Sequence, residues 1–123
     1  MIGIGTDIVA VDRIARLLER YDQRFTQRVF RPDELVLAAR RGPRRAAALA
    51  ARWAAKEAFL KALGRPTGGI AARDIEVVRD DVGRPSLLLH GSAAAALAGV
   101  GASGTRISLS HEDRFAIAVV VVF

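Results

Sequence analysis

The spacing of apolar residues predicts a strand followed by helices in the first half of the chain. Glycine and apolar residues alternate from Ile2 to Ile8, which indicates a short strand with Asp7 at its end. Apolar residues at helical spacing come next, and Asp12 stands where it can cap the helix that they define. These apolar positions are Ile14, Leu17, Leu18 and Tyr21.

Proline and glycine mark the boundaries of the next helices. Pro32, followed by two acidic residues, is typical of a first helical turn. The basic segment 40–45 interrupts this second helix. A long alanine-rich helix then runs from about Arg45 to Leu63, and Gly64 is a typical residue to follow a helix end.

Beyond this point the helical spacing gives way to alternation, which predicts strands. Strands around 75–77 and 87–89 are joined by a turn at 80–83, with Pro85 just after it. Ser92 can cap a short alanine helix that ends near a group of glycines.

The C-terminal segment predicts one more pair of strands. Residues 106–110 and 115–123 flank a connection of hairpin length at 111–114. No internal repeat or linker divides the chain. The whole pattern therefore favours one α+β domain over residues 1–123, with a mostly antiparallel sheet and a long helix packed on it.

Composition narrows the classes of protein that fit this pattern. With 123 residues and 51% hydrophobic content, the chain is small enough that association with other copies would help to bury its surface. It has no cysteine, which excludes a disulfide framework, a thiolate metal site and a catalytic cysteine. We find neither a signal-peptide pattern nor a run of about 18 apolar residues, so we expect a soluble cytoplasmic protein that does not enter a membrane.

Positive charge is concentrated in the first half of the chain. Residues 1–64 contain thirteen lysines and arginines against seven acids, whereas residues 65–123 contain six of each. A basic segment of this kind favours an anionic partner, whether nucleic acid, membrane, nucleotide or acidic protein. Part of the charge forms a stripe on the first predicted helix, at Arg13, Arg16, Arg20 and Arg24.

The long helix carries the first candidates for chemistry. Only two of the nineteen cations are lysines, Lys56 and Lys61, and their retention favours a chemical role over chance retention on a solvated face. Trp53, Glu57 and Lys61 share one helix face with the glycine that ends the helix. An exposed ion pair between Glu57 and Lys61, contributing about 0.2–0.5 kcal/mol, would also explain this spacing.

Asp7 and Glu57 are candidate ligands of a divalent cation. Carboxylate oxygens from two different elements suit Mg²⁺, with water and a substrate phosphate completing its shell. Spacing does not show that the two side chains meet, and Asp7 could instead cap a local backbone N–H.

Two other motifs are less specific. His111 could donate to a phosphate, join Glu112 and Asp113 in a metal site, or satisfy backbone groups at a hairpin, and the last role is the default. The motif Gly3-Ile4-Gly5 lacks the third glycine and the helix start of a dinucleotide-binding loop, so we discount it.

Four segments that together span nearly the whole chain form a recognisable combination. Taken in order, they resemble the holo-acyl-carrier-protein synthase family of small 4′-phosphopantetheinyl transferases. The Gly-x-Asp motif near the N-terminus and the Ala-Lys-Glu-Ala helix are highly specific in combination. The segments are GIGTDIVAVDRI at 3–14, RVFRPDEL at 28–35, ARWAAKEAFLKALG at 51–64 and ISLSHEDRFAIAVVVV at 107–122.

The resemblance implies the 4′-phosphopantetheinyl transferase fold and a reaction that moves phosphopantetheine from coenzyme A to a serine of an acyl carrier protein. Asp7 and Glu57 would bind Mg²⁺ together with the coenzyme A pyrophosphate. Lys61 would stabilise or protonate the adenosine 3′,5′-bisphosphate that leaves. Further coenzyme A contacts are expected at Arg52, Gly64, Arg84, Pro85, Ser110 and His111.

The resemblance also implies two kinds of partner. Proteins similar to this one are homotrimers whose sites lie between subunits. The acidic carrier protein is expected on the basic helix that follows Asp7. The carrier-binding residues would be Arg13, Arg16, Leu17, Arg20, Arg24, Phe25 and Arg28. The chain departs from the family pattern at Thr6 and in its Arg/Ala-rich segment 38–52.

Two hypotheses from other classes explain less of the sequence. A nucleic-acid-binding module would account for the positive charge, but the chain lacks the interleaved aromatic residues of a stacking platform. A carrier-binding scaffold without catalysis would not need Asp7, Glu57 and Lys61 together.

Overall fold

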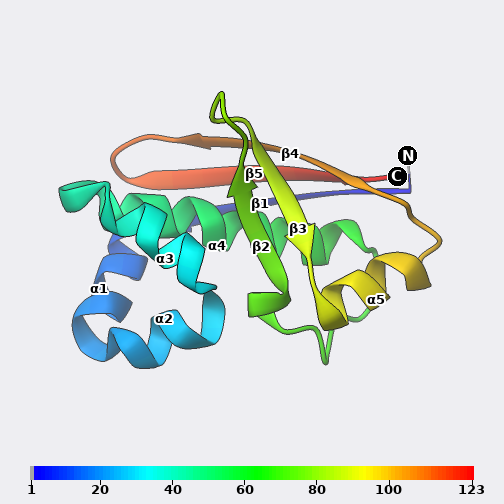
Figure 1. The fold of residues 1–123 in the computed structure, drawn as a ribbon, viewed down its shortest axis with the longest axis horizontal. Helices are drawn as coiled ribbons and strands as arrows, with labels where there is room; N and C mark the ends of the chain where they lie inside the picture. The colour runs from blue at the N-terminus through cyan, green and yellow to red at the C-terminus, as the bar shows by residue number, and fades with distance from the viewer. Residues whose placement is uncertain (1) are drawn as a thin grey trace.

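A long helix packed beneath a three-stranded antiparallel sheet is the centre of the fold (Figure 1). In this computed structural model, which describes residues 2–123, β5 is the middle strand of the sheet, between β1 and β4. The helix beneath is α4 (Arg45–Ala62). The strands are β1 (Gly3–Ala10), β4 (Thr105–His111) and β5 (Phe115–Val122).

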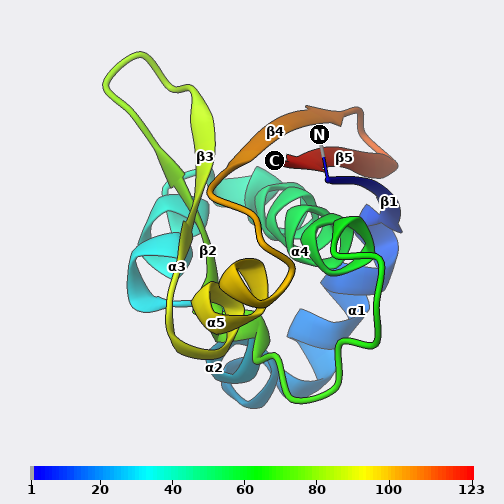
Figure 2. The same cartoon turned by 90° about the vertical axis from the view of Figure 1, so that its right-hand side faces the viewer.

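The other elements surround α4 on its remaining sides. A separate two-stranded hairpin crosses beside the sheet, and its tip projects beyond the body of the protein (Figure 2). This hairpin consists of β2 (Ile75–Arg79) and β3 (Pro85–Leu89). The α-helices are α1 (Val11–Tyr21), α2 (Gln23–Val29), α3 (Pro32–Ala39) and α5 (Gly91–Gly99), and the short 3₁₀ turns are η1 (Gly42–Arg44) and η2 (Ala72–Asp74).

Most of the predicted elements are confirmed, with small shifts at their ends. Pro32 occupies the first turn of α3, and a basic loop separates α3 from α4 as expected. Gly64 follows α4 with a φ of +67°, the left-handed conformation that glycine adopts most easily. Within residues 2–123, no helix is both long enough and apolar enough to cross a membrane.

Both predicted N-caps were wrong. The first helix begins at Val11 with Ala10 as its N-cap, so Asp12 lies inside the first turn and no side chain caps this end. The last helix begins at Gly91, so Ser92 is also inside the first turn. Ser92 instead donates its hydroxyl to Asp74 and accepts the backbone N–H of Ala71. In both cases a helix starts directly from an extended residue, which apolar spacing alone does not reveal.

The basic stripe is not continuous, contrary to the prediction. The first helix ends at Tyr21, and Asp22 has φ 33° and ψ −104°, a conformation that no helix contains. Arg24 therefore belongs to α2, at an angle to the helix that carries Arg13 and Arg20. Arg45 of α4 pairs with Asp22 at 3.2 Å across this break.

Two glycines allow β1 to lie directly on α4. A Cβ atom added to Gly5 would stand 2.1 Å from the carbonyl oxygen of Ala58, and one added to Gly3 would stand 1.9 Å from that of Ala62. The helix contributes alanines at the same contact, so both backbones are free of bulky side chains there. The motif that resembled part of a nucleotide-binding loop therefore serves packing.

The opposite face of the sheet is exposed in the single chain, and it is mainly apolar along β1 and β5. Ile4, Ile8 and Ile117 are 59%, 63% and 40% exposed. Val119 and Val121 lie on the same face at half-buried positions, opposite Thr6 and Ile4 in the register. Strand β5 is therefore apolar on both of its faces, with Ala116, Ala118, Val120 and Val122 buried on the other side.

We predict that Gly5→Ala lowers the free energy of unfolding by about 3 kcal/mol, because the added methyl group must push the strand away from α4. Gly68→Ala is the matched control, since its added Cβ would meet nothing within 4 Å. Urea denaturation checks both, and the control should change stability by less than about 1 kcal/mol. Equal losses for the two variants would contradict the close-approach account.

Candidate active site

Asp7 points at α4 because of its place on β1. Side chains alternate along a strand, so Asp7 lies on the same face as Gly3 and Gly5. The ammonium of Lys61 donates to Asp7 Oδ1 at 2.9 Å, and the Asp7 side chain is only 15% exposed. The same glycines that bring the strand onto the helix therefore bring this carboxylate to the helix surface.

Glu57 lies one helical turn before Lys61, on the side of α4 that Asp7 faces. Burial raises the pKa of the Glu57 carboxyl, and the nearby charge of Asp7 raises it further, while Lys61 and Arg13 oppose the shift. The two carboxylates are thus close enough to repel one another, and the ammonium of Lys61 is paired with the carboxylate of Asp7. This donor set of hard oxygens suits a small divalent cation.

A second cluster of charge surrounds Arg52. Its side chain is 5% exposed, its Nη1 donates to the carbonyl oxygen of Ala48 at 3.1 Å, and its buried Nε has no hydrogen-bond partner among the described residues. Burial lowers the pKa of Arg52, Glu34 opposes this, and the charges of Arg79 and Arg41 lower it further. A bound anion would offset the repulsion between these cations and accept the unpartnered N–H of Arg52.

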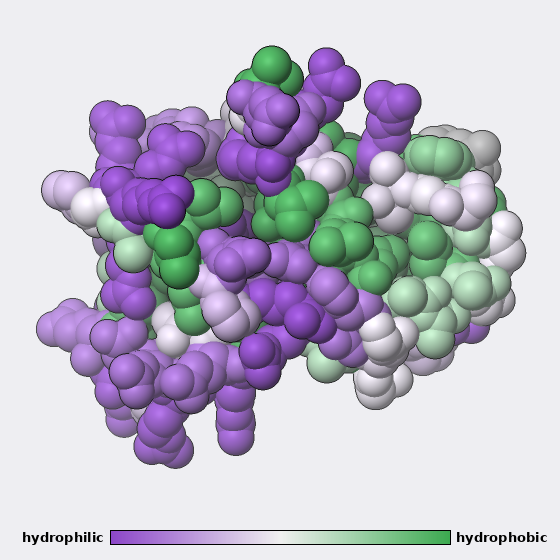
Figure 3. All heavy atoms as spheres, viewed as in Figure 1, coloured by the Kyte–Doolittle hydropathy of each residue, from purple (hydrophilic) through white to green (hydrophobic). Residues whose placement is uncertain are grey.

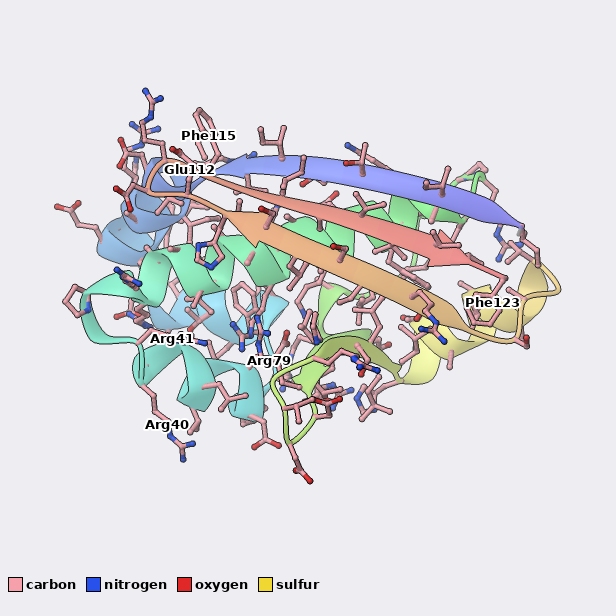
Figure 4. The ribbon with its side chains drawn as sticks, turned by 90° about the horizontal axis from the view of Figure 1, so that it is seen from above. Arg40, Arg41, Arg79, Glu112, Phe115 and Phe123 are labelled. Carbon is pink, nitrogen blue, oxygen red and sulfur yellow. The ribbon has the colours of Figure 1, made fainter. Side chains whose placement is uncertain are left out.

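The space beside Arg52 is a small cavity of about 50 Å³. Arg79 comes from β2 and Arg41 from the loop after α3, on one side of α4 (Figure 4). The charged or ionisable side chains that line the cavity are Arg41, Arg44, Arg52, Arg79 and His111. This group is referred to below as the arginine pocket.

The predicted coenzyme A contacts do not all meet. Arg52 and His111 line the same pocket. Ser110 lies on the open face of the sheet, since it is exposed and pairs with Ile117. Arg84 and Pro85 lie where the projecting hairpin begins its return strand, and the backbone N–H of Arg84 donates to Asp80 Oδ1 at 2.8 Å. Among residues 2–123, no three metal-binding side chains gather, which leaves His111, Glu112 and Asp113 without a shared metal site.

Lys56 lies in the core and not at the candidate active site, contrary to the prediction of a chemical role or a solvated position. It is 2% exposed and pairs at 2.9 Å with Glu34, which is fully buried. Glu34, Arg41 and Arg79 were not predicted as functional residues from the sequence. The one available signal was an acid at the third position of α3, and this was interpreted only as a first-turn residue.

The surface formed by α1 and α2, called the α1–α2 surface below, is rich in charged side chains and contains a cavity. Hydrophilic residues gather over the part of the protein that contains these helices, whereas apolar residues are concentrated nearer the middle (Figure 3). A cavity of about 230 Å³ is lined by Tyr21, Arg24, Phe25, Arg28 and Val29. Phe25 is nonetheless mostly buried, because its ring packs against Phe30 and Trp53 at centroid distances of 5.9 and 5.7 Å.

Comparison with known proteins gives one consistent match. The model of the 4′-phosphopantetheinyl transferase superfamily matches residues 3–120. A holo-[acyl-carrier-protein] synthase of Halorhodospira halophila is 51% identical, over 98% of this chain and 95% of the relative. A protein of the same name from Nitratidesulfovibrio vulgaris is 46% identical, over 99% of this chain and 98% of the relative.

Solved structures agree with the sequence relatives. The crystal structure of holo-[acyl-carrier-protein] synthase from Neisseria meningitidis has a TM-score of 0.87 at 37% identity, covering 100% of this chain and 99% of the other. The Helicobacter pylori enzyme, solved in complex with coenzyme A, has a TM-score of 0.84 at 31% identity, covering 98% and 99%. The predicted fold class is therefore confirmed, and the chain belongs to the 4′-phosphopantetheinyl transferase superfamily.

Proposed function

We propose that this protein transfers the 4′-phosphopantetheine group of coenzyme A to a serine of an apo acyl carrier protein, with adenosine 3′,5′-bisphosphate as the second product. The observation that carries the proposal is the meeting of Asp7, Glu57 and Lys61 at one place on α4. The chain's relatives are named as enzymes of this reaction, and one solved relative holds coenzyme A.

The residues present fit a magnesium ion. Asp7 and Glu57 supply two carboxylates whose mutual repulsion a dication would remove, and Mg²⁺ commonly takes its other ligands from water and substrate phosphates. When bound, the ion would neutralise the pyrophosphate and favour ionisation of a hydroxyl beside it.

Lys61 is the residue of this chain that can stabilise the negative charge that develops on the leaving group during the reaction. Its side chain is 56% exposed and flexible, and its ammonium already lies at the edge of the carboxylate pair. Cleavage of the pyrophosphate places a new charge on the leaving phosphate of adenosine 3′,5′-bisphosphate. A mobile point charge can contact this phosphate or give it a proton.

The arginine pocket supplies a second anion site. Coenzyme A carries a 3′-phosphate in addition to its pyrophosphate, and a buried guanidinium with an unpartnered N–H can bind a phosphate oxygen in a fixed direction. We assign Arg52, Arg79 and His111 of the arginine pocket to this 3′-phosphate. Gly64, Arg84, Pro85 and Ser110 remain proposed coenzyme A contacts on the family pattern alone.

The positions of the two anion sites support a site shared between subunits. Asp7 lies on one edge strand of the sheet and His111 on the other, with β5 between them. Adjacent strands are about 4.8 Å apart, so the edges are separated by about 10 Å, with α4 beneath. One coenzyme A molecule could use both sites if the β1 edge of one copy meets the β4 edge of the next. We propose a homotrimer with closed symmetry, in which this edge-to-edge contact completes the site and the exposed apolar residues of β1 and β5 are buried between copies.

The α1–α2 surface is the proposed docking site for the carrier protein. Arg13 and Arg20 are exposed on α1, and their guanidinium groups lie 5.8 and 5.3 Å from the ring centroids of Trp53 and Tyr21. The cavity between Arg24 and Arg28 would take an apolar side chain flanked by acids. Arg16 and Leu17 belong to the same surface, whereas the mostly buried Phe25 contributes mainly the floor of the cavity.

The reaction is tested by incubating apo carrier protein with the enzyme, coenzyme A and Mg²⁺ and by measuring the carrier's mass. We predict a gain of one phosphopantetheine on serine. Glu57→Gln should reduce the rate at least about a hundredfold, because it removes one of two carboxylates from the metal site. Wild-type rates for Glu57→Gln at limiting Mg²⁺ would show that Glu57 is not a ligand.

The same variant should have the opposite effect on stability when metal is absent. The pKa of Glu57 is raised in the folded protein, so its ionised form opposes folding above that pKa. Metal-free Glu57→Gln should therefore be more stable than wild type at pH 8, and the difference should disappear as the pH falls below the ordinary pKa of glutamate. Thermal denaturation with a chelator measures this. A difference that does not change with pH would contradict the electrostatic cause.

Carrier docking is tested by reversing charge on α1. The double variant Arg13→Glu, Arg20→Glu should raise the KM for carrier protein about tenfold or more and leave the KM for coenzyme A nearly unchanged. The control is Arg73→Glu, which also reverses the charge of an arginine but does so on η2, outside the α1–α2 surface. If both KM values rise together in the double variant, docking and coenzyme A binding are not separate on this surface.

The oligomer is tested on the open face of the sheet. We predict that replacing Val119 and Val121 with lysine yields an inactive monomer or an insoluble chain, because the two lysine charges added to each chain cannot be buried between copies without acidic partners. Val82→Lys, at the 82% exposed hairpin tip, should remain an active trimer. Sedimentation velocity and the transfer assay measure both properties. A fully active monomer would overturn the shared-site proposal.

A further inference from the structure

The buried ion pair of Glu34 and Lys56 joins three elements and has no role in the proposed chemistry. Lys56 Nζ donates to Glu34 Oε1 at 2.9 Å, to the carbonyl oxygen of Ala72 at 3.1 Å and to that of Ile75. These three bonds use all the donors of the ammonium. Lys56 therefore holds the start of β2 to the middle of α4.

Glu34 makes the same connection from the other side. Its Oε1 accepts the backbone N–H of Arg31 at 3.0 Å, and its Oε2 accepts that of Val77 at 3.1 Å. The carboxylate thus ties the first turn of α3 to β2. Both charges lie in the core with their hydrogen-bonding groups satisfied, which is the condition for such a pair to be tolerated there.

The arginine pocket lies next to this ion pair, along the same two elements, α4 and β2. Arg52 lies four residues before Lys56 on α4, so the two side chains share a helix face. Arg79 lies two residues after Val77 on β2, so it shares that strand face. The pocket is therefore formed where the two elements joined by the ion pair continue side by side.

The pocket needs such a connection because it holds like charges together. The guanidinium groups of Arg52 and Arg79 repel one another across the gap between α4 and β2, and no acid lines the cavity. Without a bound phosphate, this repulsion favours separation of the two elements. A connection in the core, one turn away and screened from water, opposes that separation.

We propose that Glu34 and Lys56 are positioning residues for coenzyme A: by fixing β2 against α4 they keep Arg52 and Arg79 within reach of one phosphate group. The inference rests on the proposed function, specifically on the assignment of the 3′-phosphate to the arginine pocket. Neither residue touches the substrate. Their effect is confined to the affinity for a donor that carries the 3′-phosphate.

The test uses a variant that removes the pair without leaving a buried charge. Glu34→Leu combined with Lys56→Met keeps the net charge near the pocket unchanged and fills the core with apolar side chains of similar size. The backbone groups of Ile75 and Val77 lose their partners, so the variant should expose the Val77 amide to faster hydrogen exchange. Single variants are avoided because either would leave one unpaired charge in the core.

The readout is the discrimination between coenzyme A and 3′-dephospho-coenzyme A, given by the ratio of their kcat/KM values. We expect the wild type to prefer coenzyme A and Arg52→Ala to lose this preference. In the double variant, this preference should fall roughly tenfold because the KM for coenzyme A rises, while the KM for carrier protein stays unchanged. Val122→Ala, a core change at the far end of the sheet, controls for lost stability and should keep the preference.

The possible results separate the two proposals. If Arg52→Ala loses the preference but the double variant keeps it, the positioning role is overturned and the pocket assignment stands. If the wild type shows no preference, or Arg52→Ala retains it, the pocket does not hold the 3′-phosphate and both proposals are overturned. If the double variant and Val122→Ala lose the preference equally, the positioning role is overturned, because a general loss of stability accounts for both losses.

Discussion

The close approach of β1 to α4 is the constraint on which the rest of the structure depends. Gly3 and Gly5 leave no room for a side chain between strand and helix, and the alanines of α4 complete the contact. Because β1 lies so close to α4, the next residue on that face of the strand, Asp7, reaches Lys61 and the surroundings of Glu57. Packing at two glycines thus determines whether the candidate metal site exists at all.

Charge repulsion is the common feature of the two anion-related sites. Asp7 raises the pKa of Glu57 on one side of α4, and Arg79 and Arg41 lower the pKa of Arg52, after burial, on the other. Each arrangement opposes folding of the empty protein and gains from a ligand of opposite charge. Residues that bind ligands in this way are expected to be a cost to stability, which core contacts elsewhere must offset.

The sequence allowed prediction of the fold class, nearly all elements and the residues that meet at Asp7, because periodicity and a specific motif combination carry that information. It did not reveal the break at Asp22, where one strained residue divides what apolar spacing presents as a single helix. Nor did it separate Lys56 from Lys61, because residues five apart lie on different faces of a helix and only the packed structure shows which face is buried. The arginine pocket was found only in part because Arg41 and Arg79 come from distant segments with no shared spacing.

The central claim is that the contact between β1 and α4 creates a divalent-metal site from two carboxylates. The most direct measurement is anomalous diffraction from crystals grown with coenzyme A and Mn²⁺ in place of Mg²⁺. The account predicts a peak between the carboxylates of Asp7 and Glu57, at coordination distance of about 2.1–2.2 Å from an oxygen of each. A peak at another position, or one that contacts neither carboxylate, would contradict it.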